Sequence, residues 1–145
     1  MGQTQTKKYS LAQKLDSREE YFIENGCIFI EKQIALSRGQ NPGSTQLKIL
    51  SVGEIEKATN NYDPKLVLGS IQSTVFKGVI DDQVVVVKVP IDFHLNRHLI
   101  DIYLTEAATA MVMNHENLVK IYGGCLETCI PIMVYEYLCW TFSPN

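Results

Sequence analysis

Two short stretches that lie close together in the chain decide the fold. Val67–Gly78 reads V-L-G-S-I-Q-S-T-V-F-K-G, and Val84–Val89 reads V-V-V-V-K-V, so that Lys88 ends a run of valines. β-Branched residues bounded by turn residues predict strands. Nucleotide phosphates can be held by two strands joined by a tight turn and followed by a third strand that carries a lysine. The turn within Val67–Gly78, however, has almost none of the glycines that such a site needs.

The same patterns continue along the chain and predict an α+β unit. It has five strands, and one helix is inserted after the third strand. The expected strands span 65–71, 74–80, 83–89, 118–127 and 130–137, and the expected helix spans 96–113. Asp81 and Asp82 are predicted to form the turn between the second and third strands.

The residues before this unit predict a helical extension. Two helical pieces are expected between Asp16 and Ser37. The break is predicted at Glu24-Asn25-Gly26, because Gly26 can adopt the left-handed conformation that ends helices.

A loop at 38–45 and a short strand at 47–50 are expected to connect the extension to the unit. Ser51-Val52-Gly53-Glu54 then matches a capping box, in which the serine and glutamate side chains satisfy the free amides at a helix start. This helix is predicted to reach Asn60.

Length, charge and composition exclude several classes of protein. The 145 residues are enough for one modest domain or for part of a larger one. The net charge is -3, and the only evident basic cluster is Lys7-Lys8, which argues against a nucleic-acid-binding protein. No apolar stretch approaches the roughly 20 residues that span a bilayer, and the first residues are polar, so we expect a cytoplasmic protein.

The cysteines predict neither a disulfide scaffold nor a metal site. Cys27, Cys125, Cys129 and Cys139 show no C-x-x-C spacing. A zinc site at Cys125 and Cys129 would need two more ligands, and His115 is the only histidine nearby. We expect buried, reduced thiols, with a metal site as the alternative.

The first eight residues, M-G-Q-T-Q-T-K-K, match the pattern for N-myristoylation at Gly2, with Thr6 at the hydroxyl position. One myristoyl chain binds membranes only weakly, and Lys7 and Lys8 add some attraction to anionic lipid. The pattern predicts peripheral association with the cytosolic face of the plasma membrane. The alternative is an unmodified polar terminus.

Several motifs resemble one family at matching intervals. They are V-V-V-K at 85–88, Glu106 in the next helix, N-H-E-N-L-V-K-I-Y-G-G-C-L-E at 114–127 and M-V-Y-E-Y-L at 133–138, preceded by E-I-E-K-A-T-N-N-Y-D at 54–63. From Ser51 to Leu138 the chain resembles the small lobe of plant receptor-like kinases. The unusual turn and E-N-G-C-I-F-I-E-K-Q-I-A at 24–35 are most similar to the plant pseudokinases that act as adaptors of an intracellular immune receptor.

This resemblance implies a protein-kinase-like small lobe whose five-stranded sheet is antiparallel. With the patterns described above, it divides the chain into three parts. A flexible segment that carries the acylation pattern is expected at 1–15, a helical extension and loop at 16–50, and a truncated kinase-like domain at 51–145.

In that family, the lysine at the position of Lys88 pairs with the glutamate at the position of Glu106 and holds nucleotide phosphates. Independently of the family, a lysine between Val87 and Val89 on an interior strand needs a partner for its charge. The carboxylate of Glu106 can face the sheet, so we expect the two to pair. A purely structural ion pair is the alternative.

The family's glycine-rich turn has the form G-x-G-x-x-G-x-V. If Val75 matches the family valine without gaps, Leu68, Ser70 and Ser73 occupy the glycine positions. If Gly69 is the first glycine, one residue has been deleted. Each non-glycine residue held at positive φ would cost on the order of 1 kcal/mol, so tight nucleotide binding is not expected.

Val86 and Val75 are predicted to lie at the roof of the adenine site. Val86 shares a strand face with Lys88 and is larger than the alanine that the family usually has there. Val75 still fits the family position. Together with Lys88, Glu106 and Gly69, these residues predict a degenerate nucleotide site that requires no cofactor and binds ATP weakly at most.

The expected function is protein binding rather than catalysis. In the family that the chain resembles, the catalytic groups lie in H-R-D, D-F-G and A-P-E motifs. The sequence contains none of these three strings. We therefore expect no catalytic residues, and an inactive signalling or immune adaptor whose partners are an immune receptor or other receptor-like kinases. The alternative is a truncated fragment of an active serine/threonine kinase that binds ATP through Lys88 and Glu106.

Overall fold

The computed structural model describes residues 3–37, 47–70, 72–91, 96–112 and 119–137. Side chains are described from Ser17 onward. Gly2, His115 and Cys139 lie outside the described residues. The predictions made for them are therefore not addressed by the structure.

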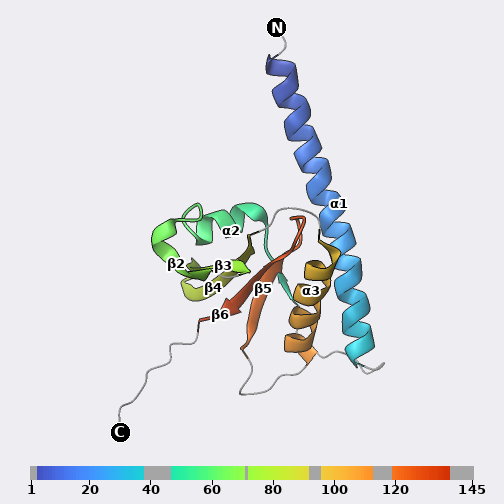
Figure 1. Ribbon diagram of the computed structural model, residues 1–145, viewed down its shortest axis with the longest axis vertical. Coiled ribbons are helices and arrows are strands. Elements are labelled where there is room, and N and C mark those ends of the chain that lie inside the picture. Colours follow the sequence, from blue (N-terminus) through green and yellow to red (C-terminus); the bar gives the residue numbers. More distant parts are fainter. Residues whose placement is uncertain (1–2, 38–46, 71, 92–95, 113–118, 138–145) are drawn as a thin grey trace.

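A six-stranded mixed sheet forms the centre of the described part of the chain (Figure 1), so the predicted α+β class is confirmed. The sheet order is β1-β5-β6-β4-β3-β2. The strands are β1 (Lys48–Ile49), β2 (Val67–Ser70), β3 (Ser73–Ile80), β4 (Gln83–Pro90), β5 (Ile121–Cys125) and β6 (Ile132–Glu136).

The prediction of five antiparallel strands was wrong, because β1 adds a sixth strand that runs parallel to β5. The pairing is extended by Leu50, whose amide donates to the Gly124 carbonyl at 2.9 Å and whose side chain is fully buried. Gly123 permits the close approach of β1. A Cβ atom at this position would lie 2.5 Å from the Lys48 carbonyl oxygen.

The β3–β4 hairpin forms as predicted. Ile80 pairs with Gln83, and Asp81 and Asp82 between them have φ values of 49° and 61°. Two successive residues in the left-handed region are the signature of the two-residue hairpin turn whose twist matches that of the strands. This turn fixes the register that places Val75 opposite Lys88.

Helices cover both faces of the sheet (Figure 1). On one face, α3 (Arg97–Val112) packs through Leu104, Ala107 and Ala108 against Met133 of β6. The other face carries α2 (Val52–Ala58), which begins with the predicted Ser51–Glu54 capping box and is followed by a 3-10 turn, η1 (Pro64–Leu66). The sheet therefore separates two apolar cores.

The amino-terminal extension is one helix, α1 (Gln3–Ser37), and not the two pieces that we predicted. Gly26 lies within it and does not end it. Asn25 is buried, and its side-chain amide donates at 3.0 Å to the carbonyls of both Leu126 and Thr128. These contacts join α1 to the segment between β5 and β6, so tertiary contacts outweigh the helix-ending tendency of Asn25-Gly26.

Further contacts hold α1 beside α3, along which it runs in Figure 1. Phe29 is buried in the same core as α3. Lys32 forms an ion pair with Asp101. Among the described residues, no helix combines the length and the apolar character needed to cross a bilayer.

The Asn25 contacts can be tested by replacement. We expect Asn25→Ala to lower the free energy of unfolding by about 2 kcal/mol, because it leaves the buried Leu126 carbonyl without its donor. Urea unfolding followed by circular dichroism measures the change. Glu31→Ala, at an exposed position of the same helix, is the control, and equal stability of the two variants would contradict the assignment.

Candidate functional site

The predicted site residues that the structure describes lie next to one another on β2, β3, β4 and α3. Side chains alternate between the two faces of β4, so Val86 and Lys88 point to the α3 side, and Val86 packs against the core there. Val75 of β3 pairs with Lys88, and Gly69 of β2 pairs with Val75. Glu106 lies on α3.

The structure brings Lys88 and Glu106 together, with 3.6 Å between Lys88 Nζ and Glu106 Oε2. The Lys88 side chain is 27% exposed and that of Glu106 is 47% exposed, so the pair is less buried than the position of Lys88 among valines indicates. Exposed pairs of this kind contribute about 1 kcal/mol or less to stability. The pair therefore contributes little to the stability of the fold, and it places the Lys88 ammonium group beside α3.

A second residue of α3 also contacts Lys88. This residue is Tyr103. The Lys88 Nζ lies 4.9 Å from the centroid of its ring, a distance at which the negative face of the ring attracts a cation. Tyr103 is buried, and it lies one helical turn before Glu106. Sequence reasoning missed this contact, although the i, i+3 spacing to Glu106 was the available signal.

Tyr135 of β6 brings a buried hydroxyl group to the same place. It pairs with Val86 across the strands and is 8% exposed. Its hydroxyl makes no hydrogen bond of ordinary geometry with the described residues. Burial raises the pKa of Tyr135, and the nearby Glu106 carboxylate raises that pKa further. Sequence reasoning did not identify this residue as part of the site.

The described residues of the β2–β3 hairpin have none of the positive φ values that a glycine-rich phosphate turn uses. Ladder pairing continues up to Ser70 and Thr74, and Leu68, Ser70 and Ser73 all have negative φ. Gly69 also lacks a positive φ. Among the described residues of this hairpin, none therefore uses the conformational freedom that glycine provides.

These features fit a nucleotide only in part. The Lys88 ammonium group, positioned by Glu106, suits a phosphate. The hairpin does not suit a close phosphate cradle, because Leu68 and Ser70 carry side chains where such cradles have glycine. Val86 and the Tyr135 ring occupy space on the same face of the sheet.

The described cysteines are free thiols in different environments. Cys27 is exposed, Cys129 is half-buried and Cys125 is buried in the core under α2. Burial raises the pKa of Cys125 to about 11. In the described part of the chain, no three His, Cys, Asp or Glu side chains lie close enough together to hold a metal ion.

Comparison with known proteins finds similarity to plant receptor kinases. Over 134 residues, or 90% of the chain, it is 35% identical to wall-associated receptor kinase-like 4 of Arabidopsis thaliana. It is 31% identical over 122 residues to wall-associated receptor kinase 2 and 36% identical over 121 residues to wall-associated receptor kinase-like 3 of the same plant. No protein-family model matches the chain.

The chain spans only 16–17% of the length of these relatives. The matches cover 82–90% of the chain itself, so the similarity extends over most of its described elements. It supports the relationship to plant receptor-like kinases that the sequence motifs indicated.

The buried Tyr135 hydroxyl generates a prediction. We expect Tyr135→Phe to raise the free energy of unfolding at pH 7 by about 1 kcal/mol, because it removes a buried hydroxyl that makes no hydrogen bond of ordinary geometry with the described residues. Thermal unfolding measures the difference. The control is Tyr137→Phe, at a half-buried position two residues away. A loss of stability in Tyr135→Phe would instead show a hydrogen bond to Glu106.

The raised pKa of Tyr135 also gives that variant a pH signature. The folded protein retains the phenolic proton to higher pH than the unfolded chain, whose tyrosine titrates near 10.0. Ionisation of Tyr135 therefore costs more in the folded protein than in the unfolded chain, so the folded protein loses stability relative to its value at neutral pH as the pH rises above 10. Unfolding measured between pH 8 and pH 11 should show a smaller alkaline loss in Tyr135→Phe than in wild type.

Proposed function

We propose, on the premise that the chain is related to plant wall-associated receptor kinases, that it is a kinase-like small lobe that works as a protein-binding signalling adaptor. In this proposal the nucleotide site is degenerate, and binding of a protein partner replaces phosphoryl transfer. The observation that carries the proposal is an exposed apolar stripe on α1.

This stripe consists of Ile23, Cys27, Ile30 and Ile34. The three isoleucines are 62%, 55% and 61% exposed, and Cys27 is exposed as well. Spacings of four, three and four residues place all four side chains on one face of the helix, as in the seam of a coiled coil. A row of exposed isoleucines on one helix face is typical of a surface that binds another protein.

The opposite face of α1 is already occupied. Phe29 is buried, Asn25 bonds to two carbonyls and Lys32 pairs with Asp101 of α3. The stripe is thus presented by a helix that is fixed to the sheet through α3. A preorganised surface of this kind loses little conformational entropy when a partner binds.

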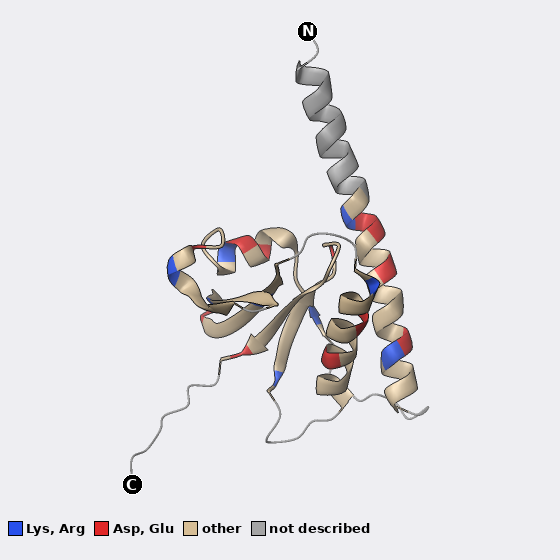
Figure 2. Cartoon of the chain, in the orientation of Figure 1, with Lys and Arg blue, Asp and Glu red and all other residues tan. Residues whose placement is uncertain are grey.

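Acidic side chains border the stripe. Glu20, Glu24 and Glu31 are all exposed, and acidic residues recur along the described side chains of α1 in Figure 2. Two copies packed through this stripe would bring these glutamates toward each other, which is unfavourable. The partner surface that fits is apolar with a basic border, so a different protein is favoured over a second copy.

Resemblance and sequence supply the remaining parts of the proposal. The similarity of 24–35 to immune-receptor adaptors makes plant defence signalling the proposed setting, with an immune receptor or another receptor-like kinase as partner. Acylation of Gly2 would hold the protein at the cytosolic face of the plasma membrane.

A second candidate function is ATP binding by a piece of an active kinase. The observation that favours it is the 3.6 Å Lys88–Glu106 pair, which positions an ammonium group for a phosphate. A thermal shift on addition of magnesium and ATP that Lys88→Ala abolishes would support this candidate. A shift that survives in Lys88→Ala would place ATP elsewhere.

The adaptor proposal is tested by changing the stripe. We expect the double variant Ile30→Asp/Ile34→Asp to lose binding to the protein partner that wild type binds. Binding would bury the two new carboxylates in an apolar interface without a counter-charge. The measurement is quantitative affinity capture from plant cells, followed by binding assays with the purified partner. Folding is checked by circular dichroism.

The matched control is Val79→Asp. Val79 lies on β3 and is 54% exposed, close to the 55% of Ile30, but it is outside the stripe. Partner binding should persist in this control and in Lys88→Ala. Equal binding by wild type and by the stripe variant would overturn the proposal.

A further inference from the structure

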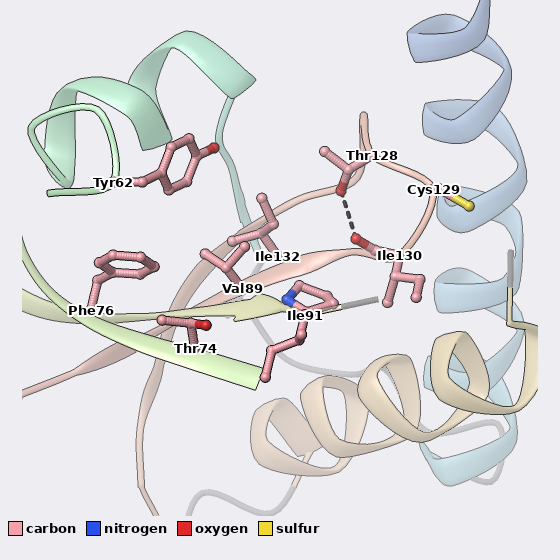
Figure 3. Close-up of a pocket in the computed structure, with 10 residues that line it drawn as sticks. Tyr62, Thr74, Phe76, Val89, Ile91, Thr128, Cys129, Ile130 and Ile132 are labelled. Carbon is pink, nitrogen blue, oxygen red and sulfur yellow. Dashed lines mark hydrogen bonds between the residues drawn. The ribbon is translucent and has the colours of Figure 1, made fainter. Parts of the chain in front are cut away.

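A cavity of about 500 Å³ lies on the face of the sheet that Lys88 does not face. Thr74 and Phe76 of β3 and Val89 of β4 line it, and these residues alternate with Val75 and Lys88, which point the other way. Ile132 of β6 also contributes to it. Figure 3 shows Tyr62, Phe76, Val89 and Ile132 around a common space. The cavity is therefore separate from the candidate nucleotide site.

The described residues that line this cavity are almost entirely apolar, and none of them is Asp, Glu, His, Lys or Arg. The titratable residues among them are Tyr62 and Cys129. The pKa of Tyr62 is raised, chiefly by burial, so its hydroxyl stays protonated. The remaining polar groups are the hydroxyls of Thr74 and Thr128, and Thr128 already donates to the Ile130 carbonyl at 2.7 Å.

The wall formed by Tyr62 is held in an unusual backbone conformation. Asn60, Asn61 and Tyr62 have φ values of 49°, 56° and 56°, three consecutive non-glycine residues in the left-handed region. Asparagine adopts this conformation readily after the end of a helix, whereas tyrosine does so at a cost of roughly 1–2 kcal/mol. Strain of this kind persists only where the surroundings fix it, and it is frequent around bound ligands.

Specific contacts compensate for this strain. The amide of Tyr62 donates to the Thr59 hydroxyl at 3.1 Å, and Thr59 is fully buried. The amide of Asn61 donates to the Glu56 carbonyl at 2.7 Å. The rings of Tyr62 and Phe76 then meet edge to face, with centroids 5.8 Å apart. The cavity wall is thus formed before any ligand arrives.

We propose that this cavity is a binding site for a small, uncharged, largely apolar molecule with one hydrogen-bonding group. The volume lies within the range of roughly 300–1,000 Å³ that is usual for small-molecule sites. The hydroxyls of Tyr62 and Thr74 are the groups that would orient the ligand.

The charge of the lining decides between kinds of occupant. An anionic ligand such as a nucleotide would lose its hydration without gaining a counter-charge, because none of the described residues that line the cavity is a lysine or an arginine. An apolar molecule gains free energy in proportion to the area it removes from water. This inference does not depend on the adaptor proposal, because it involves neither the α1 stripe nor Lys88.

The test uses the full chain and the neutral fluorescent probe N-phenyl-1-naphthylamine. We expect saturable binding of one probe per chain, seen as a rise in fluorescence. Thr74→Trp, which fills the cavity, should weaken binding about tenfold or more. Val84→Trp, an equally bulky change at an exposed position of β4, should leave affinity unchanged. So should Ile30→Asp, which removes an apolar group from the α1 stripe.

Methyl-resonance mapping on the wild-type protein provides a readout that does not require any variant to fold. The probe should shift the methyl resonances of Val89, Ile130 and Ile132, which line the cavity, more than that of Val86 on the opposite face. Three results would each overturn the inference. They are absence of saturable binding, unchanged affinity in a folded Thr74→Trp variant, and shifts centred on the Lys88 face.

Discussion

The structure depends on the pairing of β4 on both of its edges. β4 lies between β3 and β6 and pairs with both through antiparallel ladders. A central strand cannot slip by one residue without moving all of its side chains to the other face. This pairing fixes which side chains of β4 enter each core. Val85 and Val87 lie in one core, and Val86 and Lys88 lie on the side of the other.

This constraint explains why the two faces of the sheet have different chemistry. On the α3 side, Lys88 is surrounded by Glu106, Tyr103 and the buried Tyr135 hydroxyl, so charge and hydrogen-bonding groups gather there. The opposite side holds Phe76 and Ile132 beside an apolar cavity. One face is suited to an anion and the other to an uncharged molecule, although the residues concerned alternate along the same strands.

Sequence reasoning succeeded where the signal is local. The Asp81-Asp82 turn, the Ser51–Glu54 capping box and the strand periodicity of β3 and β4 each depend on residues within a few positions of one another. It failed at Asn25-Gly26, because the two carbonyls that bind Asn25 are more than 100 residues away in the chain.

The sequence by itself determined the strands and the α3 helix of the unit and the face of β4 that carries Lys88, since these follow from backbone periodicity, and the family resemblance indicated Glu106 as the partner of that lysine. Only the tertiary structure decided that α1 is continuous, that β1 joins β5 in parallel, and that Tyr103, Tyr135 and the apolar cavity lie where they do. Each of these is the outcome of contacts between segments that are distant in the chain. Local propensity is weaker than the free energy of such packing, and it carries no information about which partner a side chain will meet.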